Sequence, residues 1–408
     1  MSQTEDSNAV CPAFPARREA PFEVPAEYVG WRDSGPLKKV TLPSGAPAWV
    51  VTRYEEVRTL LSDIEVTNGV TANRLSPHFP NTRSGVIGVD QASNIVFMDE
   101  PQHGKLRRAL ASSFSAKTIN SMRPGIQKTI DDVLDRMLEA GSPADLHQAF
   151  SLPIPSGMIC QLLGMPYEDH EFFETVTVKL LSRTTTAEDH AASQQSLFDY
   201  LRKAVQERDA NPTEDDLIGR LIINNVRKGS MTLDQVAGLS LVMLIAGHET
   251  TANSLTMITA HLLSHPELTQ MLLADPSVVT DLIEEELRVT SISDVIMARQ
   301  AVRDFELGGC PVKAGEGIIP LGGAANYDPR VFEDPAVVNL SRASRNHLAF
   351  GFGVHACIGQ NLARVELELA LTTLLARIPS IRLEVAVDTI DFKHDAMVFG
   401  AYGLPVAW

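Results

Sequence analysis

The sequence predicts a mainly α-helical fold, in which one large helical domain carries a small β-rich region. Hydrophobic residues make up 44% of the 408 residues, enough to bury a large core. Residues 104–288 follow a mainly helical pattern that only short Gly and Pro clusters interrupt. After Arg288 the pattern changes to short strand-like stretches separated by glycine-containing turns.

The first thirty residues differ from the rest of the chain. Their prolines lie among charged residues without a steady period, which predicts an extended segment over residues 1–30. No long linker of Gly, Ser or Pro follows, so residues 31–408 are predicted to form a single domain. The start MSQTEDSNAV lacks the features of a secretory signal, and a cytoplasmic location is expected.

Charge, hydropathy and cysteine content exclude several classes of protein. A net charge of −16 repels phosphate and argues against a nucleic-acid partner. The longest apolar run, residues 239–247, is far shorter than the ~20 residues that cross a bilayer, so no membrane span is expected. The four cysteines lack the spacing of zinc sites or of a disulfide framework. Any cysteine that matters should therefore act alone.

The chain before the helical region predicts a hairpin and a long loop. Residues 37–51 carry apolar stretches on either side of Pro43-Ser44-Gly45, which favours a β-hairpin followed by a short helix. Residues 68–102 are rich in Gly, Pro and Asn without periodicity. They predict a long loop of the kind usually reserved for function.

The most informative helix is predicted to begin after Thr232. Thr232 and Gln235 have the spacing of a capping box, and no proline follows until Pro266. A helix of roughly 30 residues would be about 45 Å long and would pass through the middle of the domain. A last helix is predicted from about Cys357 to Arg377, before a β-like C-terminus.

Residues 350–359 combine three glycines and one cysteine ahead of an apolar-periodic helix. Gly351 and Gly353 allow a tight turn and a close approach to a flat ligand. A cysteine at a helix N-terminus has amide donors and a positive dipole end that stabilise the thiolate, which suits a metal ligand. The alternative is a glycine-rich turn with a buried structural thiol.

This string resembles the haem-binding loop F-G-x-G-x-H-x-C-x-G of cytochrome P450 enzymes at every fixed position. The resemblance implies haem b (iron protoporphyrin IX), with Cys357 as the axial thiolate that pushes electron density onto the iron. It also implies that Phe350, Gly351 and Gly359 shape the cofactor loop and that His355 contacts a haem propionate. The resemblance extends from Pro36 to Trp408 and is closest in style to actinobacterial P450s of polyketide and xenobiotic oxidation.

A second motif is the Glu-x-x-Arg of Glu285 and Arg288, whose spacing places both side chains on one helix face. Such a pair is usually a solvated surface ion pair. Before a strand region and about seventy residues ahead of the cysteine, it resembles the structural pair of the P450 family. Arg342 lies where the family places the second arginine of that buried network, which would hold the thiolate loop.

The third motif, residues 246–251, lies mid-way along the long helix. Gly247 loosens the helix, and Thr250 is placed to donate a hydrogen bond to the carbonyl of Ala246, which would open a groove for O₂. Glu249 and Thr250 resemble the family's acid–alcohol pair, which relays protons. The alternative is a polar interruption of a buried helix.

Three further residues are implied as haem contacts. His103 and Arg107 match the family's His-x-x-x-Arg, and Arg299 matches a third propionate contact, since propionates need charge-assisted donors. A basic helix start is otherwise an ordinary solvated face. The basic cluster between Lys105 and Lys117 is also the predicted ferredoxin dock, with plain surface charge as the alternative.

The resemblance implies O₂- and NAD(P)H-dependent hydroxylation or epoxidation of a sizeable apolar molecule by a monomer, with electrons from a ferredoxin and its reductase. Two alternatives remain: peroxide-driven oxidation, coupling or rearrangement on the same fold, and a haem-based binding or sensing protein. Apolar residues in four parts of the sequence are predicted to line the substrate pocket. They are Val86, Ile87, Val96, Leu244, Ile292, Val295, Ile296, Val398 and Phe399.

Overall fold

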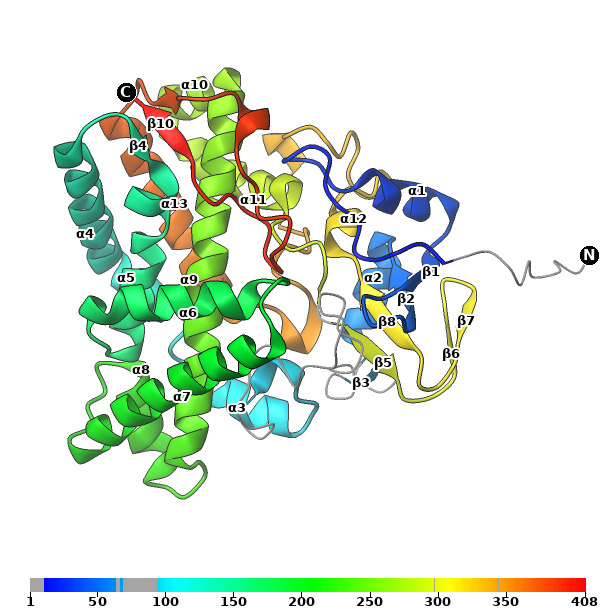
Figure 1. Cartoon of the computed structure of the whole chain (residues 1–408), viewed down its shortest axis with the longest axis horizontal. Helices are drawn as coiled ribbons and strands as arrows, with labels where there is room; N and C mark the ends of the chain where they lie inside the picture. The colour runs from blue at the N-terminus through cyan, green and yellow to red at the C-terminus, as the bar shows by residue number, and fades with distance from the viewer. Residues whose placement is uncertain (1–10, 64–66, 69–93, 297, 343–344) are drawn as a thin grey trace, which may run out of the picture.

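The computed structural model describes residues 11–63, 67–68, 94–296, 298–342 and 345–408. Most helices gather on one side of the molecule, and the main sheet lies with α1, α2 and α12 on the other (Figure 1). The α-helices are α1 (Ala26–Ser34), α2 (Tyr54–Ser62), α3 (Gln102–Ala111), α4 (Ala116–Ala140), α5 (Pro153–Leu163), α6 (His170–Leu181), α7 (Ala187–Ala210), α8 (Leu217–Leu221), α9 (Leu233–Ser264), α10 (Pro266–Ala274), α11 (Val279–Thr290), α12 (Gly322–Asn326) and α13 (Gln360–Arg377).

The β structure forms one larger sheet and two small ones. The strands of the larger sheet follow the order β1 (Leu37–Thr41), β2 (Pro47–Val51), β8 (Gly317–Pro320), β5 (Arg299–Ala301), β3 (Thr67–Asn68). The smaller sheets contain β4 (Ala144–Asp145), β10 (Pro405–Ala407) and β9 (Arg382–Leu383), and the pair β6 (Phe305–Leu307) and β7 (Cys310–Val312). The predicted hairpin is therefore present as β1 and β2, and β2 joins the distant β8 in parallel. This pairing unites the N-terminal hairpin with the strand region after Arg288.

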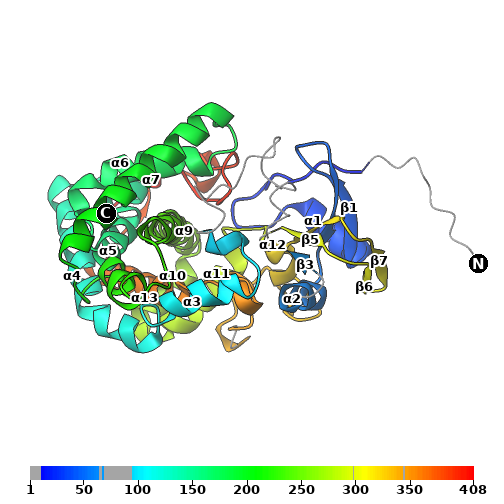
Figure 2. The same ribbon diagram turned by 90° about the horizontal axis from the view of Figure 1, so that it is seen from below.

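The long predicted helix is α9. Thr232 caps it, and the reciprocal bonds between Thr232 and Gln235 complete the capping box. Helix α9 packs against α5, α7, α11 and α13, and Figure 2 looks along it at the centre of the helical side. Because neighbours surround it, its side chains are buried on almost every face. Ala246 departs from this rule, since it is exposed in the middle of the helix.

The described part of the N-terminal segment, from residue 11 on, packs against the rest of the chain. Phe14 and Arg18 are buried, and the Phe14 N–H donates to the Thr41 carbonyl at 3.0 Å. Helix α1 begins at Ala26, so the extended path ends before the predicted residue 30. Helix α1 forms there because Tyr28, 1% exposed, buries its ring against the sheet region.

Two further features bear on the site. Helix α13 begins at Gln360 rather than at Cys357, because a short 3₁₀ turn over Gly353–His355 and the loop after it hold Cys357 outside the helix. The other short helices are η2 (Ile95–Phe97), η3 (His147–Ser151), η4 (Tyr167–Asp169), η5 (Ile222–Val226), η6 (Pro276–Val278), η7 (Leu340–Arg342) and η9 (Val387–Thr389). Within the described ranges, no helix combines the length and apolar character needed to cross a membrane.

Candidate functional site

The loop before α13 is shaped by its glycines and by two backbone hydrogen bonds. Gly351 and Gly353 have φ of 69° and 73°, in the left-handed region that favours glycine. A Cβ at Gly353 would also lie 2.3 Å from the Leu61 carbonyl oxygen. The Ala356 N–H donates to the Gly353 carbonyl at 3.0 Å, and the Cys357 N–H donates to the Phe350 carbonyl at 2.8 Å, which closes the loop. The two glycines and the two backbone hydrogen bonds therefore determine the position of the Cys357 sulfur.

The Cys357 side chain is exposed to open space rather than packed against other atoms. Enough protein surrounds that space for burial to raise the pKa of the thiol. The N–H groups of Gly359 and Gln360 and the charges of Arg107 and Arg364 oppose this rise. The amides at the start of α13 therefore do not offset the cost of burying the Cys357 thiolate. A metal cation bound to the sulfur is the group that would deprotonate the thiol.

Helix α9 contributes the second part of the site. The Thr250 hydroxyl donates to the Ala246 carbonyl at 2.7 Å, the hydrogen bond predicted from the sequence. Thr250 is half-buried and Ala246 is exposed, so this turn is uncovered along a helix that is otherwise packed. A Cβ at Gly247 would lie 3.0 Å from Ile159, so Gly247 allows α5 to approach closely. The uncovered turn offers room for a ligand.

The third part of the site is a group of cationic and imidazole side chains. Arg299 is 5% exposed on β5, and its Nη1 has no hydrogen-bond partner among the described residues. The rings of His103 and His355 lie 4.0 Å apart, centroid to centroid. Burial and the nearby Arg299, His103 and Arg107 lower the pKa of His355 to about 3. Arg299 and His355 line a pocket of about 430 Å³, including its open mouth, which Asp99 also borders.

This donor set fits a haem. An exposed sulfur on a glycine loop can serve as an iron ligand. A buried guanidinium nitrogen without a partner, beside an imidazole, can bind a negatively charged haem propionate. Arg107 makes a bond that the sequence did not reveal: its Nη2 donates to the Ala356 carbonyl at 2.6 Å. This bond ties α3 to the residue immediately before Cys357. The haem contacts of His103, Arg107, Arg299, Phe350, Gly359 and His355 stay predictions.

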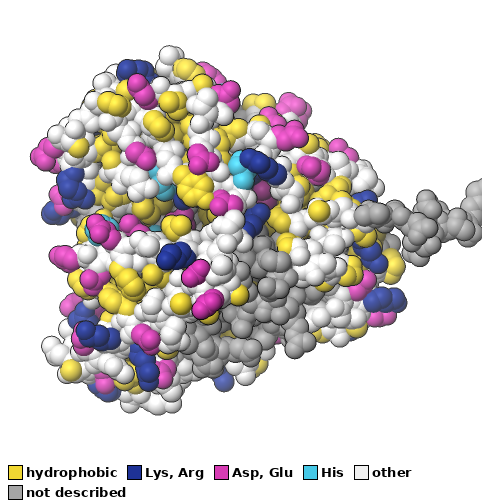
Figure 3. Space-filling view, in the orientation of Figure 1, with side chains coloured by type: hydrophobic (Ala, Val, Ile, Leu, Met, Phe, Trp, Pro, Cys, Tyr) yellow, Lys and Arg dark blue, Asp and Glu magenta, His cyan; other side chains and the backbone are white. Residues whose placement is uncertain are grey.

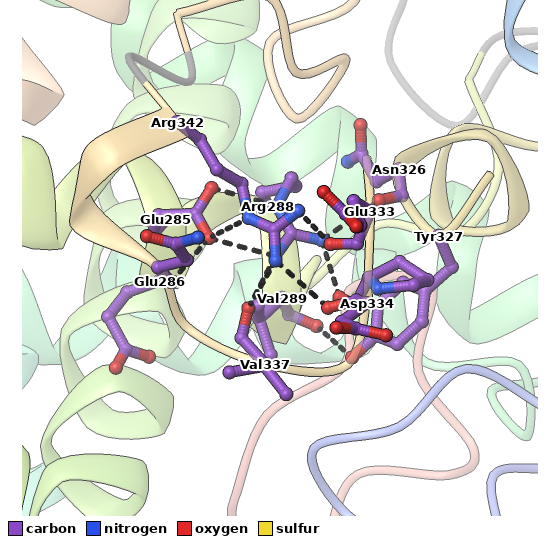
Figure 4. Close-up of polar contacts among 12 residues, drawn as sticks. Glu285, Glu286, Arg288, Val289, Asn326, Tyr327, Glu333, Asp334, Val337 and Arg342 are labelled. Atoms are coloured by element: carbon purple, nitrogen blue, oxygen red, sulfur yellow. Dashed lines mark hydrogen bonds and ion pairs between the residues drawn. The ribbon is translucent and has the colours of Figure 1, made fainter. Parts of the chain in front are cut away.

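Glu285 and Arg288 form a buried pair rather than a surface one. Their side chains are 1% and 0% exposed, and both guanidinium–carboxylate bonds measure 2.9 Å. The remaining Arg288 donors reach the carbonyls of Asn326, Pro335 and Val337, as Figure 4 shows in part. The guanidinium thereby joins α11 to the segment after α12, which leads toward the cysteine loop.

Arg342 is a second arginine beside Glu285. Its Nε is 3.2 Å from Oε2 of Glu285, and its Nη2 donates to the Asp334 carbonyl at 2.9 Å (Figure 4). The Asn339 N–H also donates to Glu285 at 2.9 Å. Glu285 is therefore shared by two arginines and a backbone amide, which explains how a carboxylate is retained in the interior.

Sequence reasoning missed the two acids that flank Glu285. Glu284 binds Arg364 of α13 at 2.5 and 2.9 Å and His347 at 3.1 Å. Burial alone would raise the pKa of Glu284, but these two partners lower it to about 2. Glu286 binds His261 of α9 at 2.8 Å. Consecutive residues point about 100° apart on a helix, so three successive glutamates need three separate partners.

Sequence reasoning also missed the partner of Glu249. Its carboxylate accepts from Lys393 at 2.8 Å and from Asn253 at 2.9 Å, and the Glu249 and Lys393 side chains are 7% and 6% exposed. Burial alone would raise the pKa of Glu249, but Lys393, His248 and Asn253 lower it to about 2. No local sequence signal pairs position 249 with 393, since 144 residues separate them. In this arrangement Glu249 binds Lys393 rather than Thr250.

Replacing Lys393 by methionine should destabilise the protein by about 3–5 kcal/mol at neutral pH, because it strands a buried carboxylate. In the parent, the pKa of Glu249 is lower in the folded than in the unfolded state, so its ionised form stabilises the fold at pH values above the unfolded pKa. This stabilisation is lost as the pH falls through the folded pKa of about 2. Without Lys393, burial raises that pKa, so the variant loses stability as pH rises past roughly 4. The difference in urea unfolding free energy should therefore be larger at pH 8 than at pH 5. The double variant Lys393→Met/Glu249→Gln should remove this pH dependence, and an equal loss at both pH values would contradict the explanation.

The structure brings together only some of the residues predicted to line the substrate pocket. Val86 and Ile87 lie outside the described residues. Leu244 is fully buried in a hydrophobic cluster that Val96, Ile292 and Val398 share, so its side chain has no exposed surface. The Phe399 N–H donates to the Ile292 carbonyl at 2.7 Å, which joins two of the predicted wall segments. Val295 and Ile296 belong to the clusters around the larger sheet.

Comparisons with known proteins agree on one family. A family model described as Cytochrome P450 matches residues 47–393. Vitamin D3 dihydroxylase of Streptomyces griseolus is 40% identical over 408 residues, covering 100% of this chain and 98% of the relative. Pentalenic acid synthase of Streptomyces avermitilis is 39% identical, with 100% of both chains covered. The solved structure of CYP105P1 in complex with filipin I has a TM-score of 0.92 at 36% identity, covering 98% of this chain and 99% of that one. Mycinamicin VIII C21 methyl hydroxylase from Micromonospora griseorubida has a TM-score of 0.89 at 34% identity, covering 97% and 100%.

Proposed function

This chain belongs to the cytochrome P450 family and is a monooxygenase, and from that premise we propose that it hydroxylates or epoxidises a sizeable apolar small molecule. The family uses haem, O₂ and NAD(P)H-derived electrons. The observation that carries the proposal is the exposed Cys357 sulfur on its glycine loop, in a chain whose α9 has an uncovered turn at Ala246 and Thr250. When bound, the haem supplies the oxidising power for inserting one oxygen atom.

The roles of this chain's own residues follow from their positions. Cys357 would be the iron ligand, and Arg299, His355 and His103 would hold the propionates. Thr250 would deliver a proton from its Oγ1, which already lies at the uncovered turn of α9. Glu249 would feed that relay only after leaving Lys393, because its low pKa keeps it ionised while the pair is intact.

Replacing Thr250 by alanine should leave haem binding intact and reduce the share of NAD(P)H electrons recovered in product several-fold. The hydroxyl is the proton donor at the uncovered turn, and without it the reducing equivalents should be lost as hydrogen peroxide. The measurement compares NAD(P)H consumed with product and peroxide formed. Thr251→Ala is the matched control, because the Thr251 hydroxyl makes the same bond to the carbonyl four residues back, at 3.2 Å, from a buried position. Unchanged coupling in Thr250→Ala would remove Thr250 from the mechanism.

Electrons are proposed to arrive from a ferredoxin and its reductase. Lys105, Arg108 and Lys117 are exposed around α3 and the start of α4, which supports a docking surface for an acidic partner. Arg107, by contrast, turns inward to the cysteine loop. A cytoplasmic location and a monomeric state complete the proposal; the four free cysteines are typical of a reducing compartment.

The test is reconstitution of the purified protein with ferredoxin, reductase, NAD(P)H and O₂. We expect incorporation of one oxygen atom from O₂ into an apolar substrate, and a thiolate-type spectrum for the reduced carbonyl complex. The similar proteins include two that, by name, act on vitamin D3 and mycinamicin VIII, so such apolar molecules are the first substrates to test. Turnover with peroxide but never with O₂ and reductant would favour the peroxide-driven alternative.

A further inference from the structure

A pocket on the surface joins three segments that are distant in the sequence. It encloses about 430 Å³, including its open mouth, between the N-terminal segment, the end of α6 and the C-terminal loop. We call it the basic pocket. Figure 3 shows basic and histidine side chains side by side on this face of the molecule. Its polar lining includes Arg17, Arg18, Arg183, Asp294, Lys393 and His394.

Two of these cations are already neutralised. Arg18 binds both oxygens of Asp294, at 2.6 and 3.2 Å, and is itself 4% exposed. Lys393 is paired with Glu249. Their charges are therefore used within the protein and leave little attraction for a ligand.

Arg183 is not neutralised in this way. Its Nε is buried and has no hydrogen-bond partner in the described structure, and its Nη1 reaches only the His394 carbonyl at 3.5 Å. Neither Arg183 nor Arg17 forms an ion pair with another described residue. Burial lowers the pKa of Arg183, although Tyr28, Asp294 and Asp395 oppose this. A guanidinium with a buried, unused donor has the fork geometry that binds a carboxylate through two parallel bonds.

Part of the pocket lining is apolar. Ile292, Met397 and Phe399 form it, and the first two pack against the hydrophobic cluster that contains Leu244 of α9. Leu244 lies two residues before Ala246, where α9 is uncovered. The pocket thus combines charged groups with apolar residues that adjoin the core next to the proposed reaction site.

We propose that the basic pocket binds a carboxylate of the substrate, with Arg183 as the specificity-determining contact and the apolar body of the molecule directed toward α9. The inference rests on the proposed function, because it names the class of substrate: an apolar molecule with an acidic end remote from the oxidised carbon. A large polyanion does not fit this site, since the chain carries a net charge of −16.

Calorimetric titration of the intact haem protein with dodecanoate and with methyl dodecanoate tests the proposal. The two probes share an alkyl chain and differ in the charge of the head group. We expect dodecanoate to bind more tightly than the ester, and Arg183→Gln to weaken dodecanoate about tenfold while leaving the ester unchanged. Arg183→Lys should recover part of the preference for dodecanoate over the ester, because lysine restores the positive charge but not the paired donors of a guanidinium.

Arg382→Gln is the matched control, because Arg382 is an exposed arginine on β9, away from the pocket lining. This variant should bind both probes as the parent does. Equal binding of acid and ester by the parent, or an equal loss of both probes in Arg183→Gln, would overturn the proposal. Calorimetry reads binding without turnover, and the reduced carbonyl spectrum reads the thiolate. A failure of the pocket is thereby distinguished from a failure of the proposed function.

Discussion

Replacing Cys357 by serine is expected to abolish the thiolate-type carbonyl spectrum and monooxygenase turnover together. A serine hydroxyl has nearly the shape of a thiol but is a poor anion, so it cannot replace the soft, electron-donating ligand that this chemistry requires. The loop itself should survive, because its geometry depends on the glycines and on the Cys357 N–H bond to Phe350, which serine retains. The measurement is the spectrum of the reduced protein with carbon monoxide, together with product formation.

Cys310→Ser provides the control for this experiment. Cys310 is a half-buried free thiol on β7, far along the chain from the loop, and its loss should leave spectrum and turnover as in the parent. A Cys357→Ser protein that kept a thiolate-type spectrum would assign the iron ligand to another cysteine and would overturn the proposed role of Cys357.

The second large effect is expected from Glu285→Ala, which should destabilise the fold by about 3–5 kcal/mol. The substitution removes the carboxylate that Arg288 and Arg342 share and leaves a fully buried guanidinium without its counter-charge. Because these arginines hold the segment that leads to the cysteine loop, haem content should fall with stability. Urea unfolding and the haem absorbance of the purified protein measure the two effects.

The matched control is Asp132→Ala, which removes a charge-paired acid from the surface of α4. Asp132 lies 2.6 Å from Lys128, with side chains 51% and 75% exposed, and such pairs contribute at most about 1 kcal/mol. The Glu285 network would not be structural if Glu285→Ala had the same unfolding free energy and haem content as Asp132→Ala.

Local sequence signals identified the helices and strands most directly. Thr232 and Gln235 marked the start of α9, Gly45 marked the turn between β1 and β2, and the Thr250 hydroxyl was predicted to bind the Ala246 carbonyl. Each of these features depends on residues within a few positions of one another, so the chain encodes it before any tertiary contact forms. Boundaries were less secure, as the later start of α13 and the presence of α1 within the end of the segment predicted to be extended show.

The partners of buried charges were decided only by the tertiary structure. The sequence placed Glu249 in a functional motif but did not reveal Lys393, and it showed Glu284 without Arg364. The uncompensated Arg183 is equally invisible until the N-terminal segment, α6 and the C-terminal loop meet. The sequence by itself determined the glycine-rich cysteine loop and the central helix, because those depend on local spacing, and its resemblance to the P450 family indicated the class of chemistry. Folding decided which charges are neutralised and which remain available to a ligand, because ion pairing depends on distances in space.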